Sequence, residues 1–194
     1  NISIINSGSG NIGSLKNMLD YLSHNSTVCD RVEDIKNSNF IFLPGVGSFD
    51  KIVKNLKKNN FYDFLRDQEN YKNSVLVGIC IGMHVLFEKS EEGKEKGLGL
   101  LKGKVKKFQD DDLRIPHMGW NNVYGKEFYH DLNNEKFYFA HSYYVDCKEE
   151  YVFAYSDYSI KLPAIVKQKN FYGIQFHPEK SNQNGLELLK KILI

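Results

Sequence analysis

Short apolar runs that alternate with helical patterns constrain the fold of this chain more than any other feature. Three runs in the first half, at 2–5, 39–44 and 74–80, have the length and apolar character of buried strands. Apolar residues at helical spacing follow the first run, as Leu15, Leu19 and Leu22 show. Buried strands that alternate with helices predict a parallel, doubly wound sheet.

The second half has a different pattern. Runs typical of strands follow one another closely at 136–145, 151–156, 163–168 and 171–176, which predicts antiparallel additions at the sheet edge. A final helix is expected to place one apolar stripe on the sheet, made of Leu186, Leu189, Ile192 and Leu193. We therefore expect an α/β fold, a three-layer α/β/α sandwich around a mixed, mostly parallel sheet. With 194 residues, 41% of them hydrophobic, the chain suits a single domain over 1–194.

Charge and hydropathy exclude several classes of function. The 26 Lys and Arg nearly balance the 24 Asp and Glu, so no strong field would attract nucleic acid or an acidic membrane. No apolar run reaches the length of a membrane span, and the first residues lack the pattern of a signal peptide. We expect a cytoplasmic protein. Its three cysteines, Cys29, Cys80 and Cys147, form no CxxC pair, so neither a disulfide framework nor a zinc site is predicted.

The opening segment contains a GxGxxG pattern, formed by Gly8, Gly10 and Gly13 between a strand-like run and a helical pattern. Asp30 follows at about the distance of a ribose-binding carboxylate, so a dinucleotide site is one hypothesis. Two observations oppose it. Glycine is common in any tight strand-to-helix turn, and the chain is too short for a separate substrate domain.

The segment SVLVGICIGMHVLF carries the most informative motif. An apolar strand leads into Gly78, Cys80 and Gly82, which form GxCxG, the cysteine counterpart of the GxSxG nucleophile elbow. A sharp turn of this kind leaves no room for side chains beside the nucleophile, and it aims the sulfur near a helix N-terminus, which favours a thiolate. The backbone N–H of Ile81 is then positioned to stabilise an oxyanion. The alternative is a structural cysteine in a glycine-rich turn.

A cysteine nucleophile needs a base and a group that orients the base. The segment YGIQFHPEK offers both, because an apolar strand leads to His177 and Glu179 follows two residues later. Pro178 favours an extended His177, so the carboxylate can accept the Nδ1 proton and leave Nε2 facing the thiol. A strand-end histidine beside a surface glutamate is the alternative. No metal site is expected, because the six histidines lack HxxxH spacing.

A third segment, FLPGVGSF, ends an apolar strand in a turn that contains Val46 and Gly47. This turn can present backbone N–H groups beside the elbow. It is either a plain loop or the second half of an oxyanion hole.

GxCxG, HPE and PGVG on an open α/β sheet of this length resemble the class I (triad-type) glutamine amidotransferases. Further blocks, SGSGNIGSL, GLGLLKG, IPHMGWN, FAHSYY and FHPEKSNQNGLELL, resemble the glutaminase subunits of imidazole glycerol phosphate synthase, from histidine biosynthesis. The resemblance covers nearly the whole chain. It implies a flavodoxin-like fold. It also implies an enzyme that hydrolyses L-glutamine to L-glutamate and ammonia and needs no cofactor.

The resemblance also implies roles for individual residues. The catalytic triad would be Cys80, His177 and Glu179. The oxyanion hole would be formed by the backbone N–H groups of Val46 and Ile81. The glutamine contacts would be Gly47, His84, Glu92, Ser142 and Tyr143. The partner would be a (β/α)₈ barrel cyclase subunit, in a heterodimer whose interface includes Asn11, Pro116, His117, Met118, Trp120 and Lys180. For Trp120, core packing is the alternative, although an aromatic residue and a methionine in a polar, glycine-containing loop suit an interface.

Two places depart from the family pattern. His84 stands where the family usually has a glutamine that contacts the substrate, and an imidazole can titrate. Asn6 and Ser7 stand where an acidic residue and an aromatic one are commoner. These departures keep two alternatives open. One is a paralogous glutaminase that supplies ammonia for amination or amidination of a surface sugar, and the other is a weakly active subunit that binds a partner.

Overall fold

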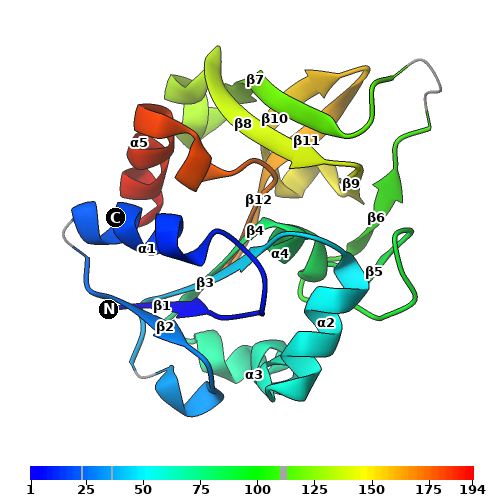
Figure 1. The fold of residues 1–194 in the computed structure, drawn as a ribbon. Coiled ribbons are helices and arrows are strands. Elements are labelled where there is room, and N and C mark those ends of the chain that lie inside the picture. The colour runs from blue at the N-terminus through cyan, green and yellow to red at the C-terminus, as the bar shows by residue number, and fades with distance from the viewer. Residues whose placement is uncertain (23, 36, 110–112) are drawn as a thin grey trace.

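The computed structural model describes residues 1–22, 24–35, 37–109 and 113–194. Within them, a mixed sheet has the strand order β2-β1-β3-β4-β12-β11-β10-β7-β8 (Figure 1). The parallel part contains β2 (Ser26–Cys29), β1 (Ile2–Ile5), β3 (Phe40–Gly45), β4 (Val75–Cys80) and β12 (Phe171–Ile174). The antiparallel part contains β11 (Ile160–Gln168), β10 (Val152–Tyr158), β7 (His117–Gly125) and β8 (Glu135–His141). A small second sheet contains β5 (Lys89–Ser90), β6 (Gly103–Lys107) and β9 (Tyr143–Cys147).

Helices cover both faces of the parallel strands (Figure 1). One face carries α1 (Ile12–Tyr21) and α5 (Asn182–Ile192), and the other carries α2 (Phe49–Lys58), α3 (Phe61–Arg66) and α4 (Ile81–Val85). Short 3₁₀ turns complete the chain: η1 (Val32–Asp34), η2 (Gln68–Tyr71), η3 (Glu127–Leu132), η4 (Glu149–Tyr151) and η5 (Pro178–Lys180). The predicted mixed sheet between two helical layers is confirmed.

The carboxyl ends of the parallel strands meet at one edge of the sheet. Cys80 is the last residue of β4, and it pairs with Gly45 at the end of β3. On the other side of β4, β12 ends at Ile174, three residues before His177. Ligands bind outside the carboxyl ends of the strands in open α/β sheets. The topology therefore gathers the separate sequence motifs at the edge where a site is expected.

Glycines allow α4 to lie directly on the strands beneath it. A Cβ atom at Gly82 would come 1.8 Å from the Leu43 carbonyl oxygen, and one at Gly78 would come 2.5 Å from the Gly82 carbonyl oxygen. Side chains at either position would push α4 away from β3 and β4. The steric role that the GxCxG pattern predicts for its glycines agrees with this packing.

The region around 117–147 differs from the sequence-based expectation. The HMGWN block was expected in a polar loop, but it forms the first half of β7, paired with β8. The single strand expected at 136–145 is two strands in two sheets, because the chain leaves the large sheet at Ser142 and pairs with β6 as β9. The apolar run continues through this break, so composition alone did not reveal it.

The helix α4 that follows Cys80 is short and ends at Val85. The carbonyls of residues 85–87, which would continue the helix, accept instead from the backbone N–H groups of Leu98, Leu101 and Gly99. These hydrogen bonds hold the segment 98–101 against the end of α4. In α5 the buried stripe is Gly185, Leu188, Leu189 and Ile192, and Leu186 is half-buried.

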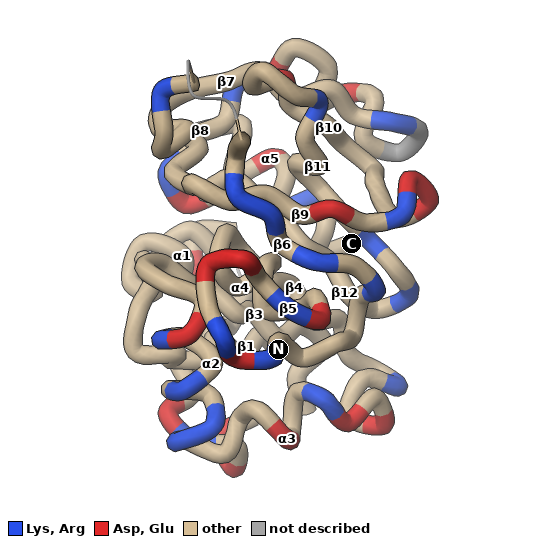
Figure 2. Tube along the Cα trace, turned by 90° about the vertical axis from the view of Figure 1, so that its right-hand side faces the viewer, with Lys and Arg blue, Asp and Glu red and all other residues tan. Residues whose placement is uncertain are grey.

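Acidic and basic residues are interspersed over the surface that carries β6 and β9 (Figure 2). The lysines of the KGKVKK segment mostly face carboxylates: Lys102 pairs with Glu88, Lys104 with Glu91 and Lys106 with Asp146. These ion pairs offset most of the positive charge of this segment. None of the helices in the described part of the chain is long and apolar enough to span a membrane.

Candidate active site

Cys80 lies at a strained turn between β4 and α4. Its φ of 54° and ψ of −111° place a non-glycine residue in a region that L-amino acids rarely adopt. Its side chain is almost fully buried, and its Sγ lies 3.8 Å from the Ala140 carbonyl oxygen. Strain of this kind at a strand-to-helix turn is typical of a nucleophile elbow.

His177 and Glu179 form a buried pair on the segment after β12. The His177 Nδ1 lies 2.7 Å from Glu179 Oε1, and each side chain is only 2% exposed. The backbone of His177 is fixed as well, because its N–H donates to the Tyr138 carbonyl and its carbonyl accepts from the Ser181 hydroxyl. Because the Glu179 carboxylate is hydrogen-bonded to His177 Nδ1, the other ring nitrogen, Nε2, is left to face Cys80.

The environment of His177 favours the imidazolium. Burial lowers its pKa, but Cys80 and Glu179 beside the ring outweigh burial and raise the pKa to about 10. Burial raises the pKa of Glu179, but hydrogen bonds from His177 and Asn11 outweigh it and lower the pKa below the usual value. An imidazolium beside a cysteine is the arrangement that favours a thiolate nucleophile.

Asn11 extends this arrangement to the opening loop. Its Nδ2 donates to Glu179 Oε1 at 2.9 Å, across 168 positions of sequence. The resemblance implied that Asn11 faces the partner, but in this structure its amide contacts the carboxylate of the candidate triad. Sequence reasoning missed this contact because nothing local to residue 11 indicates which distant side chain it meets.

A pocket of about 360 Å³ opens above Cys80. Its lining includes Asn11, Val46, Gly47, Cys80, Ile81, His84, Glu92, Pro116, Met118, Ala140, His141, Ser142, Tyr143, His177 and Lys180. Most of the residues singled out in the sequence therefore meet here, including both candidate oxyanion donors. Glu179 lies behind His177, while His117 and Trp120 lie outside the lining.

Glu92 lies in the loop after β5 and is half-buried at the pocket. It accepts a hydrogen bond of 3.0 Å from the Phe49 backbone N–H at the start of α2. Burial raises its pKa, against the effect of the Phe49 hydrogen bond. A carboxylate held in this position is suited to an ammonium group of a small ligand.

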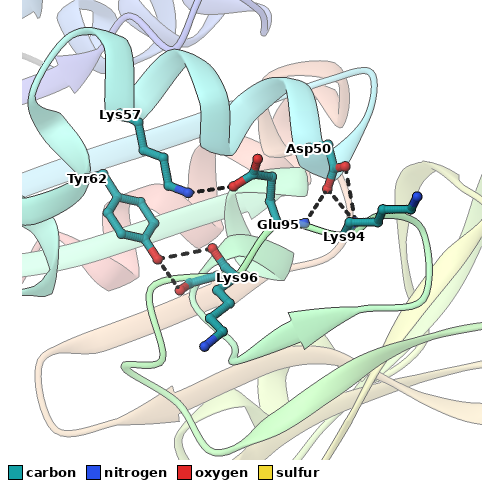
Figure 3. Close-up of polar contacts among 7 residues, drawn as sticks. Asp50, Lys57, Tyr62, Lys94, Glu95 and Lys96 are labelled. Atoms are coloured by element: carbon teal, nitrogen blue, oxygen red, sulfur yellow. Dashed lines mark hydrogen bonds and ion pairs between the residues drawn. The ribbon is translucent and has the colours of Figure 1, made fainter.

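Side chains of α2 and α3 hold the loop that carries Glu92 (Figure 3). Asp50 accepts from the backbone N–H groups of Lys94 and Glu95 at 2.9–3.1 Å. Lys57 pairs with the Glu95 carboxylate, and the Tyr62 hydroxyl contacts the carbonyl of Lys96. Sequence reasoning singled out none of these anchoring residues, because their partners lie some 30 to 45 positions away in sequence.

A chain of hydrogen bonds through two buried histidines holds the Ser142–Tyr143 segment. His141 Nδ1 lies 2.7 Å from the Tyr143 carbonyl oxygen, so it carries the proton and leaves Nε2 as an acceptor. His117 Nδ1 then donates to His141 Nε2 at 3.0 Å, and Asn121 Nδ2 donates to His117 Nε2 at 3.2 Å. Burial lowers the pKa of His117 to about 4 and that of His141 well below its usual value, so both rings are neutral near pH 7.

This series of hydrogen bonds corrects the interpretation of His117 as a residue that faces the partner. Its side chain is only 3% exposed, and its ring stacks on Tyr158 with the ring centres 3.8 Å apart. β7 alternates inward and outward side chains, so His117 points inward while Met118 points outward.

His84, expected to contact glutamine, is fully buried. Its Nε2 lies 2.8 Å from Gln175 Oε1, and its Nδ1 has no hydrogen-bond partner among the described residues. Burial lowers its pKa to about 4, against the effect of the Gln175 hydrogen bond. An imidazole with this pKa stays neutral near pH 7, which removes the basis for expecting it to titrate there. The sequence did contain a signal that could have singled out Gln175, because it is an amide side chain within an apolar run at the end of a strand.

Of the remaining residues expected at the interface, Pro116, Met118 and Lys180 line the pocket, and Trp120 lies outside the lining. Met118 is 64% exposed and Trp120 is 48% exposed, which contradicts core packing for the tryptophan. The Trp120 ring meets Tyr138 edge-on, and the Lys180 ammonium lies 5.5 Å from the centre of the Tyr138 ring. Pro116 is exposed beside them.

The GxGxxG loop lacks the geometry expected of a dinucleotide site. Gly8 and Gly10 have positive φ values and shape a tight turn, and the Ser7 hydroxyl donates to the Pro44 carbonyl. The Asp30 carboxylate, expected to bind a ribose, accepts instead from Asn6 Nδ2 at 2.8 Å. Among the residues that the structure describes, no group of three His, Cys, Asp or Glu side chains could hold a metal ion.

Comparisons with known proteins agree with this geometry. The family model "Glutamine amidotransferase class-I" matches residues 3–194. "Imidazole glycerol phosphate synthase subunit HisH 2" of Methanococcus maripaludis is 39% identical, with 99% of this chain and 98% of the relative covered. The "subunit HisH" of Leptospira interrogans is 38% identical, with 97% of each chain covered.

A solved structure titled "Crystal structure of glutamine amidotransferase" superposes with a TM-score of 0.79 at 19% identity, covering 100% of this chain and 99% of the other. The likeness in fold extends over the elements that carry Cys80 and His177. With a family model over nearly the whole chain and full-length relatives well above 30% identity, the chain belongs to the class-I glutamine amidotransferase family.

Proposed function

We propose that this chain hydrolyses the side-chain amide of L-glutamine through Cys80, His177 and Glu179. The Cys80 thiolate adds to the carboxamide carbon, and the His177 imidazolium gives its proton to the departing nitrogen, so ammonia leaves and a thioester remains. His177 then takes a proton from water, which attacks the thioester and releases L-glutamate and the thiolate. Glu179 keeps the imidazole oriented and stabilises its charged form.

The walls of the pocket suit the other parts of the substrate. Backbone N–H groups of Val46 and Ile81 would stabilise the oxyanion, and losing one such donor typically costs roughly 10²- to 10³-fold in rate. Glu92 would bind the α-ammonium group, with Gly47 beside it. The segment at Ser142 and Tyr143, fixed by the histidine chain, would hold the α-carboxylate end.

One observation carries the proposal. A strained, buried cysteine at the end of β4 and a histidine line one pocket, and the histidine Nδ1 is 2.7 Å from a buried carboxylate behind it. Neither a structural cysteine nor a surface histidine requires this combination of strain, burial and charge pairing.

The test is ammonia and glutamate release from L-glutamine by wild-type protein, Cys80→Ala and Cys147→Ala, each with the proposed cyclase partner present. Cys147 lies in β9 outside the pocket lining and serves as the matched cysteine control. We expect loss of activity in Cys80→Ala only. Undiminished release by Cys80→Ala would disprove the proposal.

We further propose that the ammonia passes to a (β/α)₈ barrel cyclase subunit, which uses it to make imidazole glycerol phosphate and an aminoimidazole carboxamide ribonucleotide. The relatives from Methanococcus maripaludis and Leptospira interrogans are named as subunits of a synthase, which supports such a partner. The exposed side chains of Met118, which lines the pocket, and of Trp120, two residues further along β7, support a docking surface there.

The partner is tested by titrating the chain with a histidine-pathway cyclase and measuring both binding and glutamine-dependent formation of imidazole glycerol phosphate. Trp120→Ala is expected to weaken binding by about tenfold or more. Tyr21→Ala removes an aromatic that is 76% exposed on α1, and it should not change binding. Hydrolysis without any coupling to this cyclase would instead favour a glutaminase that serves sugar modification. Binding without hydrolysis would favour a weakly active subunit that binds a partner.

A further inference from the structure

His84 and Gln175 join the two segments that carry the nucleophile and its histidine. His84 is on α4, one helical turn after Cys80, and Gln175 lies between the end of β12 and His177. The bond between His84 Nε2 and Gln175 Oε1 is 2.8 Å long, and both side chains are 0% exposed. It is therefore a direct polar link between the Cys80 segment and the His177 segment.

The surroundings of this bond make it specific. Gln175 is fixed by its backbone N–H, which donates to the Ala164 carbonyl at 2.9 Å. A Cβ atom at Gly173 would come 2.6 Å from Met83 Cγ, so α4 packs tightly on β12. In a buried, closely packed contact, removing one partner leaves the other polar group without a hydrogen bond.

The hydrogen bond also determines the tautomer of His84. A carboxamide oxygen only accepts, so His84 Nε2 carries the proton and Nδ1 carries the lone pair. Nδ1 has no partner among the described residues. The two nitrogens thus offer two different roles for His84: Nε2 holds Gln175, whereas a contact to the substrate would have to use Nδ1.

We propose that His84 is a positioning residue that acts through Gln175 to hold His177 in place beside Cys80, and that it does not contact the glutamine substrate. The proposal rests on the glutaminase function proposed above. His84 stands where the family usually has a glutamine. In this proposal its imidazole has a structural role, because Nε2 donates to Gln175 across the junction of α4 and β12.

The test compares His84→Gln with His84→Asn. The Gln amide nitrogen mimics Nε2 of histidine and can still donate to Gln175, whereas the Asn amide nitrogen mimics Nδ1 and falls short. The readouts are kcat and KM for glutamine with the cyclase present, and the rate at which iodoacetamide alkylates Cys80 over a range of pH. Thermal unfolding of each variant reports folding separately.

We expect His84→Gln to stay within about threefold of wild type and His84→Asn to lose roughly tenfold or more in kcat and in alkylation rate, with little change in KM, because small displacements of reacting groups are costly. Gln175→Leu should cause a similar loss, and the double variant His84→Asn with Gln175→Leu should lose no more than either change alone.

Other outcomes overturn the proposal. If His84→Asn keeps activity and His84→Gln loses it through a raised KM, His84 contacts the substrate through Nδ1. If the losses from His84→Asn and Gln175→Leu add fully in the double variant, the bond between them does not position His177. If wild-type protein releases no ammonia, the glutaminase function fails, yet the alkylation rates still decide whether the His84–Gln175 bond positions His177.

Discussion

The two sides of the pocket are held in different ways. The base side, which comprises the half-buried Asn11 and the buried His177 and Glu179, is fixed by direct bonds between side chains. The binding loop, which comprises residues 91–97 and carries Glu92, is fixed through backbone N–H groups that donate to Asp50 near the surface. If the proposed function holds, the chemical step and substrate binding depend on separate sets of contacts, and variants of the two sides should affect different kinetic constants.

The largest effect is expected from Glu179→Gln. The neutral amide fills the same space but removes the charge that stabilises the imidazolium, so kcat should fall by about 10²-fold or more while KM changes little. The pKa of His177, raised to about 10 partly by Glu179, should fall. Steady-state kinetics and an NMR titration of the ring measure both effects. A kcat within a factor of two of wild type would contradict the role of Glu179.

A smaller effect on the same side is expected from Asn11→Ala, which removes one donor to Glu179. A hydrogen bond to a charged group contributes about 1.5–3 kcal/mol, so kcat should fall roughly tenfold. The Asn11 bond helps to lower the pKa of Glu179, so the variant should raise that pKa and move the acid limb of the kcat/KM profile to higher pH.

Asn6→Ala is the matched control for Asn11→Ala. Its amide, in the same loop, donates to Asp30 rather than to the triad, so kcat and the acid limb should be unchanged. If Asn11→Ala weakened cyclase binding and left the acid limb in place, the interface role implied by the family resemblance would replace the positioning role.

A still smaller effect is expected from Asp50→Ala on the binding side. Two backbone N–H groups of the binding loop lose their acceptor, so KM for glutamine should rise several-fold, which corresponds to about 1 kcal/mol, while kcat stays near wild type. Isothermal binding of glutamine to an inactive Cys80→Ala background measures the same change without turnover.

Two variants calibrate the Asp50 result. Asp63→Ala removes the exposed acid from the first turn of α3, whose side chain makes none of the bonds to the loop described above, and should leave KM unchanged. Lys57→Met breaks the partly exposed ion pair with Glu95 and the contact of Lys57 with the Tyr62 ring, and it leaves the Asp50 bonds to the loop in place, so its KM should rise less than that of Asp50→Ala. A fall in kcat in Asp50→Ala with KM unchanged would show that the two sides of the pocket are not independent.

The parallel half of the fold was predictable because its information is local. β1, β3 and β4 are buried on both faces, so each is a nearly continuous apolar run, and α2 has a clear apolar stripe. The GxCxG turn and the HPE segment likewise place Cys80 and His177 at strand ends from a few neighbouring residues.

The antiparallel half was less predictable because its determinants are long-range. β6 has a single buried residue, Val105, and β7 exposes every second side chain, so neither has a continuous apolar run. The partners of Asn11, His84 and Asp50 lie from about 44 to 168 positions away, and only the assembled fold brings them together. Residue types at these positions were visible in the sequence, whereas the contacts were not.

The close packing of Gly78 and Gly82 has an evolutionary consequence. Any side chain at these glycines would collide with backbone and displace α4, so selection for folding alone would retain them. At Cys80, in contrast, the strained backbone favours glycine, so under the proposed function selection for chemistry retains the cysteine. In a lineage that no longer needed the ammonia, drift would erase the cysteine long before the glycines. A mutational scan scored for cellular abundance should therefore show strict glycines at 78 and 82 and accept glycine and alanine in place of Cys80.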